Sequence, residues 1–392
     1  MSFEPIYDHG GVTVYAGDCL DVLATLPDAG VDSVVTDPPY ALAFLGQRWD
    51  THTPEGFESW CRAWAAECLR VLKPGGHLVA FGGTRTYHRL AAGIEDAGFE
   101  IRDSLHWIYG AGFPKSRNLK GQWQGWGTTL KPGHEPIVLA RKPLDGTVAH
   151  NVLKHGTGAL NIDACRVAYR DAADMDQARV PQPRFGVKDS RAGTYLFRTG
   201  EGRNGEVFDP SKGRWPANVL LDTTAAAALD EQSGEQRDGV AVKRNGVTSN
   251  GVTGWGKAEP GTPDIGYGGG GGASRFFPVF RYTPKADSAE RPVVNGVRHP
   301  TVKPLDLMRW LVRLVTPPSG TVLDPFAGTG TTAEACILEG FRCIAIEREA
   351  DYLPLIRQRI DRRRDPAAYL ESRGELDGTL FDLLADDAEV AS

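Results

Sequence analysis

One stretch near the C-terminal end limits the possible folds more than any other. Residues 321–347 read as an apolar run, a loop with the sequence DPFAGTGTT, a helical segment and a second apolar run ending at Glu347. Gly328 and Gly330 allow a tight turn and a close approach between the backbone and a ligand. A strand, a tight turn, a helix and a second strand ending in an acid are typical of nucleoside-binding α/β folds. The stretch therefore predicts an α/β fold with a nucleoside cofactor at this loop.

The details of the loop favour one cofactor. Ala333 replaces the third glycine of the dinucleotide pattern G-x-G-x-x-G, and Asp324 and Phe326 fit a dehydrogenase loop poorly. A carboxylate at the strand end would repel a pyrophosphate, so it suits a cofactor that carries an amino group. S-adenosylmethionine has such an ammonium group and is the predicted cofactor. The alternative is a tight turn that binds nothing.

The rest of the chain divides into regular and irregular parts. Residues 11–110 alternate between buried strand-like runs and amphipathic helical runs, which predicts a mostly parallel sheet covered on both faces. Regularity returns near residue 300 and ends with a helix at 350–364, whose arginines are expected on a solvated face. Residues 111–290 are rich in glycine and proline, show little periodicity and are interpreted as a loop-rich insert.

Composition narrows the class of protein. The net charge of −6 argues mildly against a nucleic-acid partner, but residues 101–220 alone carry a net charge of +7. A basic middle segment would attract a polyanion, although chance clustering on a solvated surface explains it equally well. No apolar run approaches the roughly 20 residues that cross a bilayer, and the first residues do not resemble a signal peptide. A cytoplasmic protein without a membrane segment is expected.

The six cysteines show no C-x-x-C spacing, so neither a zinc site nor a redox pair is predicted. We expect reduced cysteines that serve as small apolar residues, and no metal site.

A second motif, VVTDPPY at residues 34–40, places an acid where a buried strand ends. Open α/β sheets bind their ligands at this edge. Pro38 and Pro39 fix the backbone, so a carbonyl oxygen there keeps one direction. The Asp37 carboxylate and that carbonyl can accept both hydrogens of an NH2 group, and Tyr40 offers a flat ring to stack on a heterocycle. The motif therefore predicts a clamp for an aromatic amine.

Such a clamp has a chemical purpose. The lone pair of an exocyclic amine is delocalised into its ring, which makes the nitrogen a poor nucleophile. Accepting its hydrogens draws the nitrogen towards tetrahedral geometry and frees the lone pair to attack a sulfonium methyl group in line. Positioning and electrostatics are sufficient, and no covalent enzyme intermediate is required. A simple strand-end acid followed by a proline turn is the structural alternative.

Taken together, the motifs resemble those of the DNA amino-methyltransferases, the N6-adenine and N4-cytosine family. TDPPY resembles the catalytic motif, and LDPFAGTGTT resembles the cofactor loop. HPTVKP (299–304) resembles the segment that precedes that loop. GDCLDVL, which contains Asp18, resembles the stretch whose acid contacts the cofactor adenine. The catalytic motif precedes the cofactor loop, as in the permuted beta group, whose target-recognition region lies between the two halves. Several segments, including GFPKSRNL and SRFF, are similar to those of phage and prophage methylases, which are site-specific.

The resemblance implies a fold and a domain plan. The expected fold is a Rossmann-like, circularly permuted methyltransferase fold with a mixed, mostly parallel sheet and a loop-rich inserted region. The catalytic half spans 1–110, the target-recognition insert 111–290, the cofactor-binding half 291–365 and an acidic tail 366–392.

The resemblance also implies residue roles. In this family the target base is flipped out of the duplex. Asp37 and the carbonyl of Pro38 would hold the amine, and Pro39 completes the catalytic motif. Tyr40 would stack on the base, and Phe44 and Trp49 are candidates for closing over it. The cofactor residues implied are Asp18 at the adenine, Glu347 at the ribose, Thr301 and Lys303 at the methionine end, and Asp324, Phe326, Gly328, Gly330 and Thr331 around the pocket.

The target and the partner are less tightly specified. An aspartate at the head of the motif favours adenine N6, and cytosine N4 stays open. An RNA or protein amine methyltransferase and a DNA-binding protein with an inactive methylase fold are more distant alternatives. Double-stranded DNA is the expected partner, with Arg117, Lys120 and Trp123 of the insert as candidate contacts. The sequence leaves the oligomeric state open, and a homodimer is one arrangement consistent with it.

Overall fold

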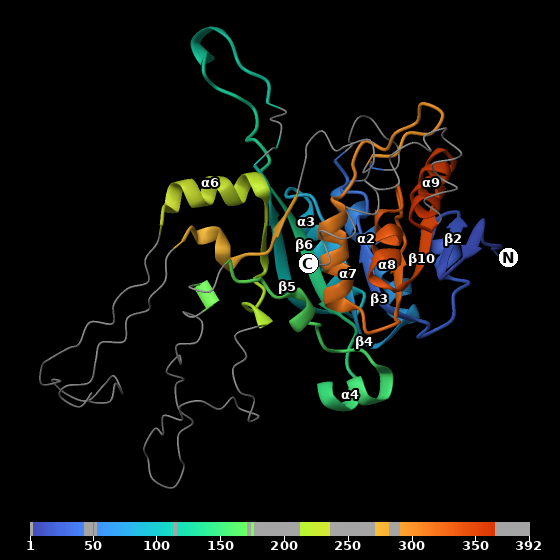
Figure 1. Ribbon diagram of the computed structural model, residues 1–392. Helices are drawn as coiled ribbons and strands as arrows, with labels where there is room; N and C mark the ends of the chain where they lie inside the picture. The colour runs from blue at the N-terminus through green and yellow to red at the C-terminus, as the bar shows by residue number, and fades with distance from the viewer. Residues whose placement is uncertain are drawn as a thin grey trace, which may run out of the picture. The chain divides into compact units, whose positions relative to one another are not determined.

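The computed structural model is shown in Figure 1. It describes residues 3–42, 50, 53–110, 112, 116–170, 174–175, 212–235, 271–281 and 291–364. The chain forms two compact units, the first built from Met1–Cys165, Asn218–Thr224 and Val279–Ser392, and the second from Arg166–Ala217 and Ala225–Pro278. The first unit contains the sheet and the cavity described below.

The described strands of the first unit form one mixed sheet with the order β1-β2-β10-β9-β3-β4-β6-β5-β7-β8. Six of the nine pairings between these strands are parallel. The strands are β1 (Tyr7–His9), β2 (Val12–Ala16), β3 (Val31–Thr36), β4 (Leu72–Phe81), β5 (Glu100–Ile108), β6 (His134–Arg141), β7 (Val219–Asp222), β8 (Val279–Phe280), β9 (Thr321–Asp324) and β10 (Arg342–Glu347). The predicted mixed, mostly parallel sheet is confirmed.

The centre of the sheet joins the two sequence motifs. β3, which leads into the DPPY segment, pairs in parallel with β9, which leads into the glycine loop, through Ser33 with Val322 and Val34 with Leu323. The loops that follow two neighbouring parallel strands emerge at the same sheet edge. The permuted chain therefore places both motifs next to each other although they are far apart in sequence.

Helices cover both faces of the sheet, as predicted for continuous apolar strands. Successive residues of β3 show this: Val34 packs in the cluster that contains residues of α1, α2 and α3, whereas Val35 packs in the cluster that contains residues of α7, α8 and α9. The helices are α1 (Cys19–Leu23), α2 (Pro54–Val71), α3 (Tyr87–Asp96), α4 (Val148–His155), α6 (Thr223–Ser233), α7 (Leu305–Val315), α8 (Thr331–Glu339) and α9 (Leu353–Arg364).

The expectation of a solvated arginine face on the last helix was wrong for two of its residues. Arg359 and Arg362 of α9 are buried and contact the carboxylate of Glu334 on α8, which Arg363 also reaches. Burial alone would raise the pKa of Glu334, but the three guanidinium groups outweigh it and lower that pKa to about 2. The sequence could not show this because the partner acid lies on a different helix.

The predicted insert, 111–290, contains three of the described strands of the sheet. β6 lies within that range, yet it pairs with both β4 and β5 and so belongs to the interior of the sheet. β7 and β8 extend the same sheet. The second compact unit begins only at Arg166. Short apolar runs such as IVLA stand among glycine- and proline-rich segments, and the sequence carries no signal of which sheet they join.

The cysteines, the membrane and metal predictions and the acidic tail can each be compared with the described residues. All six cysteines are buried free thiols, which confirms their prediction as small apolar residues. Among the residues that the structure describes, no helix is long and apolar enough to cross a membrane. The same residues contain no group of three acids, histidines or cysteines placed to hold a metal ion. The predicted acidic tail, 366–392, lies outside the described residues, as do Phe44 and Trp49.

Candidate active site

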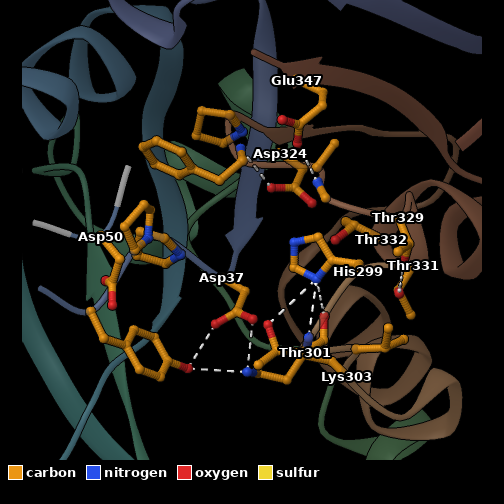
Figure 2. A pocket seen from close by; sticks show the side chains of 18 of the residues that line it. Asp37, Asp50, His299, Thr301, Lys303, Asp324, Thr329, Thr331, Thr332 and Glu347 are labelled. Carbon is orange, nitrogen blue, oxygen red and sulfur yellow. Dashed lines mark hydrogen bonds and ion pairs between the residues drawn. The ribbon is translucent and has the colours of Figure 1, made fainter. Parts of the chain in front are cut away.

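A cavity of about 890 Å³ lies at the edge of the sheet where β2, β3, β9 and β10 end. Its wall includes the DPPY segment, the glycine loop, the residues after β2 and β10, the start of β6 and the segment 299–303. Figure 2 shows Asp37 and Lys303 next to each other, with Asp324 and Glu347 further along the cavity. Parallel strands explain the arrangement, because their carboxyl ends meet at this edge.

Asp37, the first residue after β3, has both carboxylate oxygens occupied by donors of the chain itself. The Lys303 ammonium lies 2.7 Å from Oδ2, and the Tyr40 hydroxyl donates to Oδ1 at 2.7 Å. Burial and the neighbouring Asp37 raise the pKa of Tyr40, so this hydroxyl stays protonated and remains a donor. The carboxylate is therefore fixed in place and already receives hydrogens.

Lys303 is the centre of a buried charge cluster. Its Nζ lies 3.0 Å from Oε2 of Glu135 in addition to its contact with Asp37, and it donates to the Tyr40 oxygen at 3.1 Å. Burial would lower the pKa of Lys303, but the two carboxylates outweigh it and raise that pKa. The Tyr40 hydroxyl also reaches Glu135 Oε2 at 3.4 Å. Glu135 is therefore a second acceptor for both donors that hold Asp37.

Glu347 closes the other side of the cavity at the end of β10. Its two oxygens accept hydrogen bonds from the backbone N–H of Gly328 and of Glu349, each at 2.7 Å. Burial raises the pKa of this carboxyl from its ordinary value of 4.5 to about 7. Gly328 has φ +55°, and this left-handed turn, which glycine adopts readily, aims its N–H at the carboxylate. Each oxygen keeps lone-pair directions for further donors.

Asp324 connects the two central loops instead of standing apart as a ligand group. Its Oδ1 accepts from the Thr36 hydroxyl at 2.6 Å and from the Phe326 N–H at 3.1 Å. Burial raises the pKa of Asp324 to about 6. The contact ties the end of β9 to the end of β3, so Asp324 sets the relative position of the glycine loop and the DPPY segment while it also lines the cavity.

An aromatic wall stands next to the glycine loop. The Phe326 ring lies 5.4 Å from that of Trp60 and 5.5 Å from that of Trp64, measured between centroids. Trp64 is fully buried in α2, whereas Trp60 and Phe326 line the cavity. The tilted and edge-on pairs place three aromatic rings together and offer an apolar surface to the cavity.

The structure brings most of the predicted site residues together. Asp37, Pro38, Pro39, Tyr40, Asp18, Thr301, Lys303, Asp324, Phe326, Gly328, Thr331 and Glu347 all line the one cavity. Gly330 stands behind this lining as the first residue of the turn into α8, with φ +79°, where a Cβ atom would lie 2.9 Å from Ile356. Its role is to let the loop pass close to α9.

Three of the predicted residues also make contacts within the chain that the resemblance did not specify. Lys303 contacts Asp37 and Glu135, although the resemblance put it at the methionine end of the cofactor. Asp18 caps α1 by accepting from the Leu20 N–H at 3.0 Å, and one oxygen faces Arg348 at 3.6 Å. The Tyr40 ring has its hydroxyl engaged with Asp37 while it lines the cavity.

The predicted DNA contacts Arg117, Lys120 and Trp123 lie outside the cavity wall, in the segment between β5 and β6.

Sequence reasoning missed several residues of the wall. Glu135 is the second residue of β6, and no spacing in the sequence linked it to Lys303. His299 lies in HPTVKP, where no role was predicted for it; its Nδ1 contacts the Thr301 backbone, and its ring lies 4.5 Å from that of Tyr352. Burial lowers the pKa of His299, which keeps the ring neutral. A histidine two residues before a chosen threonine was the one available signal.

The sheet order and the cavity at its carboxyl edge define a Rossmann-like methyltransferase fold. The sequence matches the DNA methylase family of N6- and N4-methyltransferases over residues 31–358, and the chain belongs to that family. The family uses S-adenosylmethionine as its methyl donor.

Individual proteins are similar to this chain to different extents. The type II methyltransferase M.HindIII of Haemophilus influenzae is 30% identical over 127 residues, which cover 29% of this chain and 41% of that protein. The crystallised PvuII DNA methyltransferase, described as cytosine-N4-specific, is 15% identical and covers 91% of this chain and 90% of its own. Its TM-score of 0.51 indicates that it shares the fold. A putative DNA modification methylase of Thermus thermophilus in complex with S-adenosylmethionine gives a TM-score of 0.42 and 18% identity over 90% and 95% of the chains.

Proposed function

We propose that the protein transfers a methyl group from S-adenosylmethionine to the exocyclic amine of a base flipped out of double-stranded DNA, with N6 of adenine as the favoured target. One observation carries the proposal: a single cavity joins the carboxylate of the DPPY segment to the glycine loop and its strand-end acid. The amine clamp and the cofactor residues thus face one space. A reaction between two bound molecules needs this shared space.

The described residues fit the cofactor. Glu347 is a buried carboxylate with a raised pKa, and two hydroxyl donors of a ribose would supply the hydrogen bonds that favour its charged form. The Trp60 and Phe326 rings offer an apolar surface for a purine. When bound, S-adenosylmethionine supplies a methyl group carried on a positively charged sulfur.

A target amine would reach Asp37 either at a remaining lone-pair direction or in place of one internal partner. Both its oxygens accept hydrogens from Lys303 and Tyr40 in the described arrangement. Glu135 lies within reach of the same two donors, at 3.0 and 3.4 Å. We assign Glu135 the role of a positioning residue that keeps Lys303 and Tyr40 paired while an Asp37 oxygen turns to the amine. A buried donor left without a partner would otherwise cost about 1 to 3 kcal/mol.

The choice of base rests on the motif alone. Aspartate at its head favours adenine, and cytosine N4 is the second candidate; the cytosine-N4-specific PvuII enzyme shares the fold, which does not discriminate between the two. Target recognition is assigned to the basic region between the halves, in particular the second compact unit together with the Arg117, Lys120 and Trp123 segment. RNA or protein amines are more distant candidate substrates.

The test is methyl transfer from tritiated S-adenosylmethionine to unmethylated DNA, RNA and a protein mixture in parallel. Label should enter DNA, and modification-sensitive long-read sequencing of DNA from a host that expresses the chain should show one modified base within one recurring sequence. Absence of label in DNA would overturn the proposal. N4-methylcytosine at the site would keep the class of reaction and change the base.

A further inference from the structure

The segment between β5 and β6 folds into a self-contained hairpin, defined here as residues 116–130. Asn118 bridges to Gly127, and the Leu119 N–H donates to the Trp126 carbonyl at 2.9 Å. At its base, the Arg117 N–H donates to the Thr128 hydroxyl at 3.0 Å. These contacts satisfy several backbone groups within the hairpin itself. Figure 1 shows it projecting away from the sheet as the teal loop.

The tip of the hairpin presents aromatic side chains to solvent. Trp123 is 49% exposed and Trp126 is 62% exposed. Their rings form an edge-on pair with centroids 5.4 Å apart and an interplanar angle of 84°. Two adjacent exposed tryptophans forfeit much of the free energy that their burial would provide, so a surface of this kind indicates a binding site.

The charge around the pair identifies the kind of partner. Between Asp103 and Glu135 the sequence contains no acidic residue, whereas Arg117, Lys120 and Lys131 are basic. A partner that combines a polyanionic exterior with flat apolar layers inside matches this surface. Duplex DNA has both properties: phosphates on the outside and stacked bases within.

Both ends of the hairpin return to the active-site cavity. Tyr109, just ahead of it, and Pro132 and His134, just after it, line the cavity that contains Asp37. DNA that delivers a base to Asp37 must therefore pass the root of this hairpin. Its exposed tip and the cavity would then meet the same stretch of duplex.

Resting on the proposed function, we infer that the Trp123–Trp126 pair acts as a wedge that enters the DNA beside the target base and holds that base outside the helix. The rings take the place of the stacking surface that the departing base leaves. Proteins that kink or open DNA insert apolar side chains in this way, and a base stacked on an aromatic ring gains substantial free energy. A contact between two copies of this chain is the competing use of the same surface.

The test uses the full-length protein and duplex oligonucleotides that contain the sequence found by long-read sequencing, with a fluorescent base analogue at the target position. Unstacking of the analogue raises its fluorescence when the base is flipped. In Trp123→Ala/Trp126→Ala this rise should disappear and kcat/KM on normal duplex should fall by about 10-fold or more. Leu130→Ala is the matched control, because this side chain is 92% exposed just beyond the pair. Trp123→Phe/Trp126→Phe should keep most of the activity.

A second substrate separates a wedge from a general DNA contact. When the target base lies opposite an abasic site, extrusion costs less, and the double alanine variant should recover to within about threefold of the wild type. Melting temperature and cofactor affinity should stay unchanged, since both rings are exposed. Equal flipping and equal kcat/KM for the variant and the wild type would overturn the wedge while the methyltransferase proposal stands.

Two further outcomes are informative. Light scattering could show a wild-type dimer that the double alanine variant loses. If the abasic-site substrate also fails to restore the activity of that variant, the pair is a contact between copies and the wedge is refuted. If the wild type transfers no methyl group to DNA, the proposed function fails first, and the wedge fails with it.

Discussion

The cavity and the hairpin depart from the usual distribution of side chains in opposite directions. In the cavity, Lys303 is only 8% exposed and lies between two carboxylates. In the hairpin, two tryptophans stand in solvent on a short loop. Soluble proteins generally place charges outside and large rings inside. Both exceptions fit the proposed function, in which the cavity receives the base and the cofactor and the hairpin meets the duplex.

The two regions should respond to mutation in different ways. Removing one member of a buried charge cluster leaves another charge without its partner, which affects folding as well as chemistry. Exposed side chains on a hairpin that satisfies its own hydrogen bonds contribute little to folding. Substitutions in the cavity should therefore alter stability, pH dependence and catalysis, while those of the exposed side chains in the hairpin should alter only the response to DNA.

The largest effect is expected for Asp37→Asn. The amide replaces one acceptor oxygen with an NH2 group that repels the target amine, so single-turnover methyl transfer should fall by about 1,000-fold. Cofactor affinity, measured by calorimetry, should change little. Asp361→Asn, at a partly exposed position of α9, is the control. Transfer at near wild-type rate in Asp37→Asn would show that the clamp has been assigned to the wrong residue.

Glu347→Gln tests how the buried carboxyl of Glu347 makes the free energy of unfolding depend on pH. The folded pKa of Glu347 is about 7 against an ordinary 4.5, so between these values the folded state binds more protons than the unfolded state. Stability from this group is therefore lost as pH rises from about 4.5 to 7. Relative to Glu347→Gln, the free energy of unfolding of the wild type should decline by on the order of 3 kcal/mol across this window. Parallel unfolding curves at pH 5, 6, 7 and 8 check this, and a constant difference would contradict it.

Two glycines in the same left-handed conformation provide a matched pair. Gly330 has φ +79° and a Cβ there would lie 2.9 Å from Ile356, whereas Gly121 of the hairpin has φ +65° with nothing within 4 Å. Gly121→Ala should cost only backbone strain, about 1 kcal/mol. Gly330→Ala adds a clash and should cost about 2 to 3 kcal/mol. Urea unfolding measures both, and equal costs would mean that packing around the two loops does not differ.

Glu135→Gln should slow catalysis by about 10-fold, which corresponds to about 1.4 kcal/mol. Glutamine keeps an acceptor oxygen but removes the negative charge that balances Lys303. The rate constant should fall while the KM for S-adenosylmethionine stays the same. Because one oxygen remains, the fold should survive. If instead cofactor affinity fell and the rate constant did not, Glu135 would belong to the cofactor site and not to the support of Asp37.

The smallest effect concerns the hairpin cations. Arg117→Gln and Lys120→Gln should each weaken DNA binding a few-fold and lower the slope of log affinity against log salt concentration by about 0.9. Arg357→Gln, an exposed arginine of α9, is the control. Fluorescence anisotropy at several salt concentrations measures the slope. An unchanged slope would show that neither residue neutralises a phosphate.

Local patterns allowed much of the fold to be predicted. The strand that ends at Asp37 and the strand, turn and helix around Gly328 are encoded within short windows, and both are observed. β6 was not assigned to the sheet, because its short apolar run stands among loops and nothing in the sequence indicates the strands with which it pairs. Packing in three dimensions, not periodicity, decides such cases.

Most of the candidate site was also predictable, because strand ends at one sheet edge must converge. The cluster of Asp37, Lys303 and Glu135 was not, since its members come from three distant segments and no spacing relates them. The burial of Arg359 against Glu334 was missed for the same reason. Exposure of the hairpin tryptophans is likewise invisible to sequence, because an aromatic residue in a glycine-rich stretch can pack inward or outward.

The pairing of β3 with β9 has a consequence for how the chain is made. Thr36 and Asp324, which join the two strand ends, are 288 positions apart. At 5 to 20 residues per second, a ribosome needs roughly 15 to 60 s to deliver β9 after β3 has left it. During that time one edge of β3, an apolar strand, has no neighbour. Nascent chains stalled before residue 321 should therefore bind chaperones that recognise exposed strands, and release them once β9 emerges.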